Sequence, residues 1–88
     1  MSQASILGER VLLARRRAGL TQQQLGALVR LSSNTLARLE RGGVQELRSG
    51  AIRRLARVLG VTTDYLLGMD VADETTPEQL QLKYTVAV

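Results

Sequence analysis

The chain has 88 residues and a net charge of +4, and it contains neither cysteine nor histidine. This length suits one domain with a single modest core. The missing residue types exclude disulfides, thiolate nucleophiles, sulfur-ligated metal sites and the usual zinc sets, and they remove the commonest general base. We therefore expect no enzyme, no metal site and no cofactor.

No apolar run approaches the length of a membrane span, and the N-terminus lacks a signal-peptide pattern. The absence of cysteine fits a reducing compartment. The sequence thus predicts a soluble cytoplasmic protein without a membrane partner. So small a chain also implies no pocket for a small-molecule ligand.

Charge is distributed unevenly along the chain. Residues 1–68 contain eleven arginines against four acids, a net charge of +7, whereas residues 69–88 have a net charge of −3. A basic domain followed by an acidic tail suits a polyanionic partner, although exposed arginines are also common as plain solvated surface.

The first predicted helix runs from about residue 7 to residue 18 and ends at Gly19. Leu12 and Leu13 lie away from its core-facing side and would need a cover. Residues that share one stripe at 100° per residue form that side; they are Leu7, Val11, Ala14 and Ala18.

Residues 21–42, TQQQLGALVRLSSNTLARLERG, predict two short helices joined by a tight turn. Thr21 is expected to cap the first helix, because its hydroxyl can accept from the amide of Gln23 or Gln24. Gln24 also completes the spacing of a capping box. The apolar face of this helix consists of Leu25, Leu28 and Val29.

The second of these helices begins after a cap at Ser32 or Ser33 and ends at Gly42. Its inward residues are Leu36 and Leu39. The remaining side of the helix is polar and basic, and it carries Ser33, Asn34, Thr35, Arg38 and Arg41.

Two further helices are predicted after residue 48. A Ser49 cap begins the first, and Gly60 ends it; Thr62 then caps a helix of one to two turns. In the first of them, the residues expected to face the core are Ile52, Leu55, Ala56 and Leu59, and those expected to face outward are Arg53, Arg54 and Arg57. In the second, Leu66 and Leu67 are available for packing.

Residues 69–88 allow three interpretations. The run Thr76-Pro77-Glu78-Gln79 is typical of a helix start. The alternating residues that follow favour a half-buried strand, which would need a second subunit or the Leu12–Leu13 surface as its partner. Disorder is the third interpretation, because termini often fray. The alternating residues are Leu80, Leu82, Tyr84, Val86 and Val88.

Three motifs, LTQ, L-x-R-x-E-R-G and L-A-x-x-L-G-V, occur in this order and are flanked by LLARRRAGL and VTTDYLLG. In this combination the chain resembles the lambda-repressor/Cro-like (XRE) helix-turn-helix DNA-binding domains, from about residue 7 to residue 68. The resemblance implies an all-α, compact five-helix domain in residues 1–68. Residues 69–88 are left as an acidic and then apolar tail, for which a strand is one interpretation. The fifth helix and this tail are the candidate dimerisation elements, and we favour the tail.

The resemblance also implies an ion pair and shows two departures. Arg15 should pair with Glu40 and tie the first helix to the third. Arg30 stands in the turn where the family usually has glycine, and a non-glycine residue with positive φ costs about 1 kcal/mol there. The segment GGVQELRSG after the third helix lacks the common proline and is slightly longer.

The third helix is the expected reader of DNA bases. Asn34 can bind adenine, and Arg38, one turn further, can bind guanine with two hydrogen bonds, while Ser33 is adaptable. The alternatives are that Ser33 and Asn34 only cap the helix and that Arg38 is solvated or paired with an acid. Expected phosphate contacts are Thr21, Gln22, Thr35, Arg41, Gly43 through its amide, and Arg48.

These observations predict a sequence-specific regulator of transcription, a repressor or autoregulator, that binds double-stranded DNA. One such helix reads only a few base pairs, so we expect a two-fold homodimer on a palindromic operator. The alternative is a protein-binding adaptor with the same fold. It would bind DNA weakly, without sequence preference, and lose that binding at moderate salt.

Overall fold

The computed structural model describes residues 5–44 and 46–69, and this part of the chain is helical. The predicted all-α, five-helix fold is confirmed. The predictions for the tail lie outside the described residues, apart from Met69. The helices are α1 (Ser5–Arg17), α2 (Gln22–Val29), α3 (Ser33–Glu40), α4 (Ser49–Leu59) and α5 (Thr63–Leu67).

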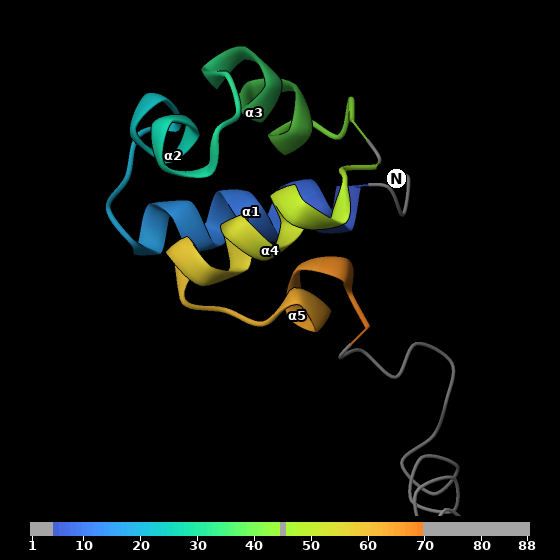
Figure 1. The fold of residues 1–88 in the computed structure, drawn as a ribbon. Coiled ribbons are helices and arrows are strands. Elements are labelled where there is room, and N and C mark those ends of the chain that lie inside the picture. The colour runs from blue at the N-terminus through green and yellow to red at the C-terminus, as the bar shows by residue number, and fades with distance from the viewer. Residues whose placement is uncertain (1–4, 45, 70–88) are drawn as a thin grey trace, which may run out of the picture.

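The helix α1 is the centre of the packing. It contacts α3, α4 and α5, while α2 contacts α3 and α4. Figure 1 shows α1 and α4 side by side, with α2 and α3 on one side of this pair and α5 on the other. The helix-turn-helix unit formed by α2 and α3 therefore packs against α1 and α4.

Apolar residues from all five helices form one core. Leu25, Leu36, Leu39 and Leu55 are among the side chains that are fully buried. Their burial supplies most of the stabilisation, because each buried leucine contributes roughly 1.5–3 kcal/mol. The core comprises Leu7, Val11, Ala14, Leu25, Val29, Leu36, Leu39, Leu55, Ala56, Leu59 and Leu66.

Three expectations about packing were wrong. Ala18 is exposed because α1 ends at Arg17 and Ala18 lies in the following turn. Leu28 is 55% exposed, because the side of α2 that faces the core consists of Leu25, Gly26 and Val29. Arg54 is half-buried rather than outward, and its Nε donates a 2.9 Å hydrogen bond to the Val29 carbonyl at the end of α2.

The predicted N-terminal caps are confirmed for α2, α3 and α5 and are wrong for α4. Thr62 caps α5 as predicted, its hydroxyl accepting a 3.0 Å hydrogen bond from the Tyr65 amide. Ser49 is not a cap but the first residue of α4; the cap position belongs to Arg48, whose side chain makes no capping hydrogen bond. None of the described helices is long and apolar enough to cross a membrane.

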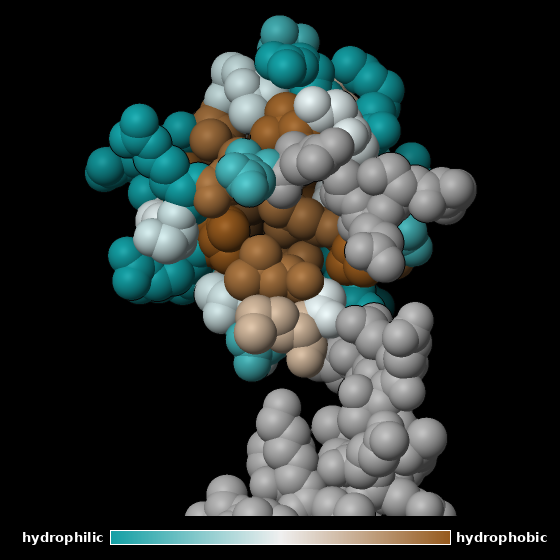
Figure 2. Space-filling model, turned by 90° about the vertical axis from the view of Figure 1, so that its right-hand side faces the viewer, coloured by the Kyte–Doolittle hydropathy of each residue, from teal (hydrophilic) through white to brown (hydrophobic). Residues whose placement is uncertain are grey.

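Figure 2 shows the face of the molecule that lies at the right of Figure 1, where apolar residues gather in the middle and hydrophilic ones surround them. At α5, Leu67 is 43% exposed and Met69 just beyond it is 70% exposed. Ile6 of α1 lies so close to Gly68 that a Cβ there would approach its Cγ2 to 2.9 Å. The start of α1 and the end of α5 thus meet.

Candidate nucleic-acid interface

The N-terminus of α2 is closed by the predicted capping box. The Thr21 hydroxyl accepts a 3.0 Å hydrogen bond from the Gln24 amide, and the Gln24 side-chain oxygen accepts a 2.9 Å hydrogen bond from the Thr21 amide. Backbone N–H groups in the first turn, other than that of Gln24, have no partner within the helix. This end of α2 is consequently able to receive an anion.

The turn between α2 and α3 places Arg30 in the left-handed conformation, with φ 62° and ψ 40°. Its N–H and that of Leu31 both donate to the Gly26 carbonyl. Arg30 thus adopts the positive φ that the resemblance implies for a glycine at this position, at a strain of about 1 kcal/mol. The Arg30 side chain is exposed.

Close packing of α2 on the following turn depends on Gly26. A Cβ at this position would collide with the Leu31 carbonyl oxygen. The same holds at the contact of α1 with α3, where a Cβ at Gly8 would collide with the Leu39 carbonyl oxygen. Both glycines let backbone approach backbone, and they fix where α3 lies relative to α1 and α2.

The cap of α3 is Ser32. Its hydroxyl accepts a 3.0 Å hydrogen bond from the Thr35 amide and donates a 2.8 Å hydrogen bond to the Thr35 hydroxyl. Ser33 is the first residue of the helix rather than its cap, and neither Ser33 nor Asn34 makes a capping hydrogen bond. The alternative that these two side chains only cap the helix is therefore wrong.

The outer side of α3 presents Asn34 and Arg38, both exposed and one helical turn apart. Among the described residues, Arg38 has no acidic partner. Ser33 and Thr35 are half-buried, and the opposite side of the helix is anchored by Leu36 and Leu39, which are fully buried. The arrangement is a rigid helix with a polar, unengaged outer side.

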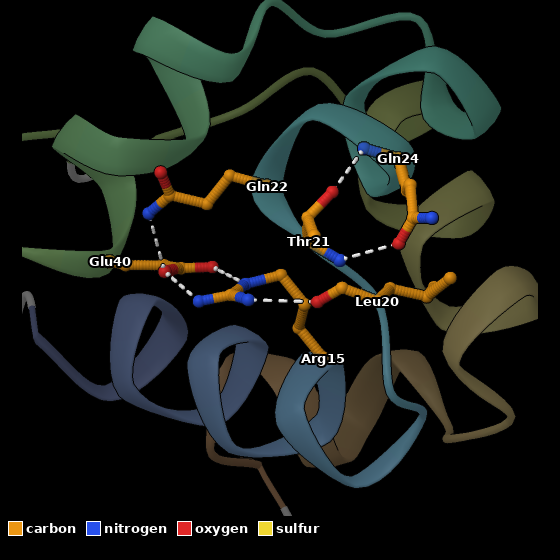
Figure 3. Close-up of polar contacts among 6 residues, drawn as sticks. All are labelled: Arg15, Leu20, Thr21, Gln22, Gln24 and Glu40. Carbon is orange, nitrogen blue, oxygen red and sulfur yellow. Dashed lines mark hydrogen bonds and ion pairs between the residues drawn. The ribbon is translucent and has the colours of Figure 1, made fainter.

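The predicted ion pair between α1 and α3 is confirmed (Figure 3). Arg15 Nε donates to Glu40 Oε2 at 2.7 Å and Arg15 Nη2 donates to Glu40 Oε1 at 2.9 Å. Arg15 Nη1 donates to the Leu20 carbonyl at 2.8 Å, which also holds the α1–α2 connection. The Glu40 side chain is only 4% exposed, so this carboxylate is held inside the domain.

Sequence reasoning missed a third member of this network, Gln22. Its Nε2 donates a 3.0 Å hydrogen bond to Glu40 Oε1. Burial raises the pKa of Glu40, but the hydrogen bonds from Arg15 and Gln22 outweigh it, and the pKa lies below its ordinary value. The hydrogen bonds that Arg15 donates to Glu40 raise the pKa of Arg15 against the effect of burial.

The remaining phosphate candidates lie in the segment between α3 and α4. Arg41, at the end of α3, and Arg48, just before α4, are both exposed. Gly43 is exposed as well, but its N–H donates a 2.8 Å hydrogen bond to the Arg38 carbonyl. A phosphate at Gly43 would have to share this proton or replace the hydrogen bond.

Comparisons with known proteins agree with the predicted family. Residues 6–67 match a family described as a helix-turn-helix domain. The chain is 34% identical over 64 residues to the HTH-type transcriptional regulator ImmR of Bacillus subtilis (strain 168), a match that covers 73% of this chain and 50% of that protein. The chain thus spans about half the length of this curated relative. No solved structure gives a significant match.

Proposed function

The chain belongs to the XRE-like helix-turn-helix DNA-binding domains, and on this premise we propose that it regulates transcription by binding a specific operator in double-stranded DNA. As a repressor or autoregulator, it would occupy a promoter and exclude the polymerase. Such a regulator acts in the cytoplasm, needs no cofactor and has no catalytic step.

The observation that carries this proposal is the outer side of α3. Asn34 and Arg38 are exposed, one turn apart and without partners among the described residues, on a helix fixed by its cap and its buried leucines. Inserted in the major groove, Asn34 would bind adenine and Arg38 guanine, and Ser33 would contact a neighbouring base edge. Each good bidentate pair discriminates by roughly 1–3 kcal/mol.

Phosphate contacts would fix the orientation of α3 without reading sequence. The N-terminus of α2 supplies one group of them, Thr35 in the first turn of α3 supplies another, and Arg41, Gly43 and Arg48 supply a third. Gly43 contributes only where its N–H shares its proton between the phosphate and the Arg38 carbonyl or gives up the hydrogen bond to that carbonyl. The proposed residues are Thr21, Gln22, Thr35, Arg41, Gly43 and Arg48.

Residues 1–68 would form the DNA-binding domain and residues 69–88 a dimerisation element. A single α3 reads only a few base pairs, and a two-fold homodimer doubles the site. The operator would accordingly be palindromic, with half-sites about one helical turn apart.

Selection of bound duplexes from a random DNA pool at physiological salt tests the proposal. The wild type should yield a two-fold consensus, and Arg38→Ala should lose preference at one base position in each half-site. Arg57→Ala is the matched control, because Arg57 is exposed in the last turn of α4, which packs on α2 and α5. No consensus with the wild type would contradict sequence-specific regulation and favour the adaptor function.

A further inference from the structure

Gln22 is the first residue of α2, and its half-buried side chain reaches Glu40 at the end of α3. Its amide nitrogen faces Glu40, and its carbonyl oxygen points away from the carboxylate (Figure 3). Glu40 Oε1 accepts two hydrogen bonds, 3.0 Å from Gln22 Nε2 and 2.9 Å from Arg15 Nη2. The carboxylate is thus held from one side by Arg15 and holds Gln22 on the other.

This contact fixes which end of the Gln22 amide faces outward. An ionised carboxylate only accepts hydrogen bonds, whereas an amide presents N–H donors at one end and a carbonyl oxygen at the other. Turning the amide end for end would place its oxygen against the Glu40 carboxylate, which is repulsive. Glu40 therefore keeps the nitrogen in place.

The amide nitrogen has a second proton, and it has no partner among the described residues. That proton is near the first turn of α2, whose free backbone N–H groups favour an anion. A phosphate at this turn would meet donors from both the backbone and the Gln22 side chain. With the amide reversed, the same phosphate would meet a carbonyl oxygen instead.

We propose that Glu40 is a positioning residue for DNA binding, which holds the Gln22 amide so that its nitrogen donates to one phosphate in each half-site. The inference rests on the proposed function, because it requires α2 and α3 to face DNA as described above. It gives the Arg15–Glu40 pair a second role besides joining α1 to α3. Glu40 itself makes no contact with DNA.

The test uses operator duplexes in which one phosphate at a time is replaced by an uncharged methylphosphonate. Binding of the full chain is measured for the wild type, Gln22→Ala and Glu40→Gln. Glu46→Gln is the matched control, because it removes the same charge from an exposed acid between α3 and α4. Thermal unfolding of each variant is recorded separately.

At one position in each half-site, replacing the phosphate by methylphosphonate should weaken wild-type binding about tenfold. This factor corresponds to the weaker hydrogen bonds to a charged group. Gln22→Ala should reduce this sensitivity to less than about twofold, at that position only. Glu40→Gln should reduce it in part, because an amide at position 40 can turn either its oxygen or its nitrogen toward Gln22. Glu46→Gln should keep it in full. A loss of stability alone would weaken binding to all duplexes alike and would not erase the effect of one phosphate.

Arg15→Met/Glu40→Met serves as a second variant, since replacing both members leaves no buried charge unpaired. It should lose the same sensitivity as Gln22→Ala, because methionine offers Gln22 no oxygen acceptor. The inference would be overturned if both Glu40 variants kept full sensitivity, or if the effect of no phosphate depended on Gln22. Sequence-specific binding would remain intact in either case. Absence of any selected operator for the wild type would instead overturn the proposed function, and the inference with it.

Discussion

Arg10 lies over the ring of Tyr65, with its Cζ 4.5 Å from the ring centroid, and its Nη1 donates a 2.6 Å hydrogen bond to the Tyr65 carbonyl. One side chain of α1 thereby holds both the ring and the backbone of α5. A helix of five residues is not stable alone, so its position depends on such contacts.

Arg10→Met should therefore loosen α5. It keeps an apolar stem but removes the cation–π contact and the hydrogen bond, which together contribute about 1–2 kcal/mol. Hydrogen exchange should show α5 amides opening more often than those of α3. Arg10→Lys keeps the charge and is the control, with a smaller effect because its point charge lacks the planar fork. Equal protection of α5 in all three proteins would contradict this role.

Stability should fall in acid through Glu40, whose folded-state pKa is lowered. Below the ordinary carboxyl value of about 4.3 the unfolded chain takes up a proton before the folded protein does. The stabilisation that Glu40 contributes is complete above the pKa of a carboxyl group in the unfolded chain. It is lost as the pH falls through the lower pKa of Glu40 in the folded protein. In urea unfolding from pH 6 to pH 3, the free energy of unfolding of Glu46→Gln, an exposed control, should fall in this way. That of Glu40→Gln should fall less.

The conformation of Arg30 predicts that Arg30→Gly stabilises the domain despite the greater freedom of glycine in the unfolded chain. Release of left-handed strain should contribute up to about 1 kcal/mol, partly offset by that entropy. Arg30→Val should destabilise, because a β-branched residue tolerates positive φ least. Chemical denaturation measures both changes. A less stable Arg30→Gly would show that the arginine side chain outweighs the strain.

Much of the fold follows from local pattern. The spacing of Leu7, Val11 and Ala14 predicts one side of α1, and the caps Thr21 and Thr62 are predicted because a cap bonds within its own turn. The errors occurred at helix ends and edges. The Ser49 prediction places the cap one residue late. Leu28 fits the helical spacing of Leu25 and Val29, but the buried side of α2 also includes Gly26, which leaves Leu28 beyond its edge.

Contacts between distant segments could not be predicted from periodicity. Arg15 and Glu40 are 25 residues apart, and only the family resemblance paired them. The bonds from Gln22 to Glu40 and from Arg54 to the Val29 carbonyl depend on how helices pack, which no local signal encodes. The residues assigned to DNA contacts stay predictions, apart from their positions in the fold.

Gly8→Ala should destabilise the domain even though alanine is the better helix former. A Cβ at Gly8 meets the Leu39 carbonyl oxygen, so α1 and α3 must separate. Overpacking of this kind costs roughly 1–3 kcal/mol or more, which exceeds the propensity gain of about 1 kcal/mol. Gly50→Ala is the control, because its Cβ would meet only the flexible end of Arg54, at 3.4 Å. Denaturant midpoints should fall for the first variant and not for the second.

The phosphate role proposed for Arg41 has a signature that differs from that of Arg38. Arg41 is exposed at the end of α3, and a charged phosphate contact releases counterions on binding. Arg41→Ala should weaken binding to operator and non-operator duplexes by the same factor. It should also reduce the slope of log affinity against log salt by about one for each protomer.

Arg53→Ala, which replaces an exposed arginine on α4, should leave that slope unchanged. A variant that lost operator preference but kept the wild-type slope would place Arg41 at a base and not at a phosphate.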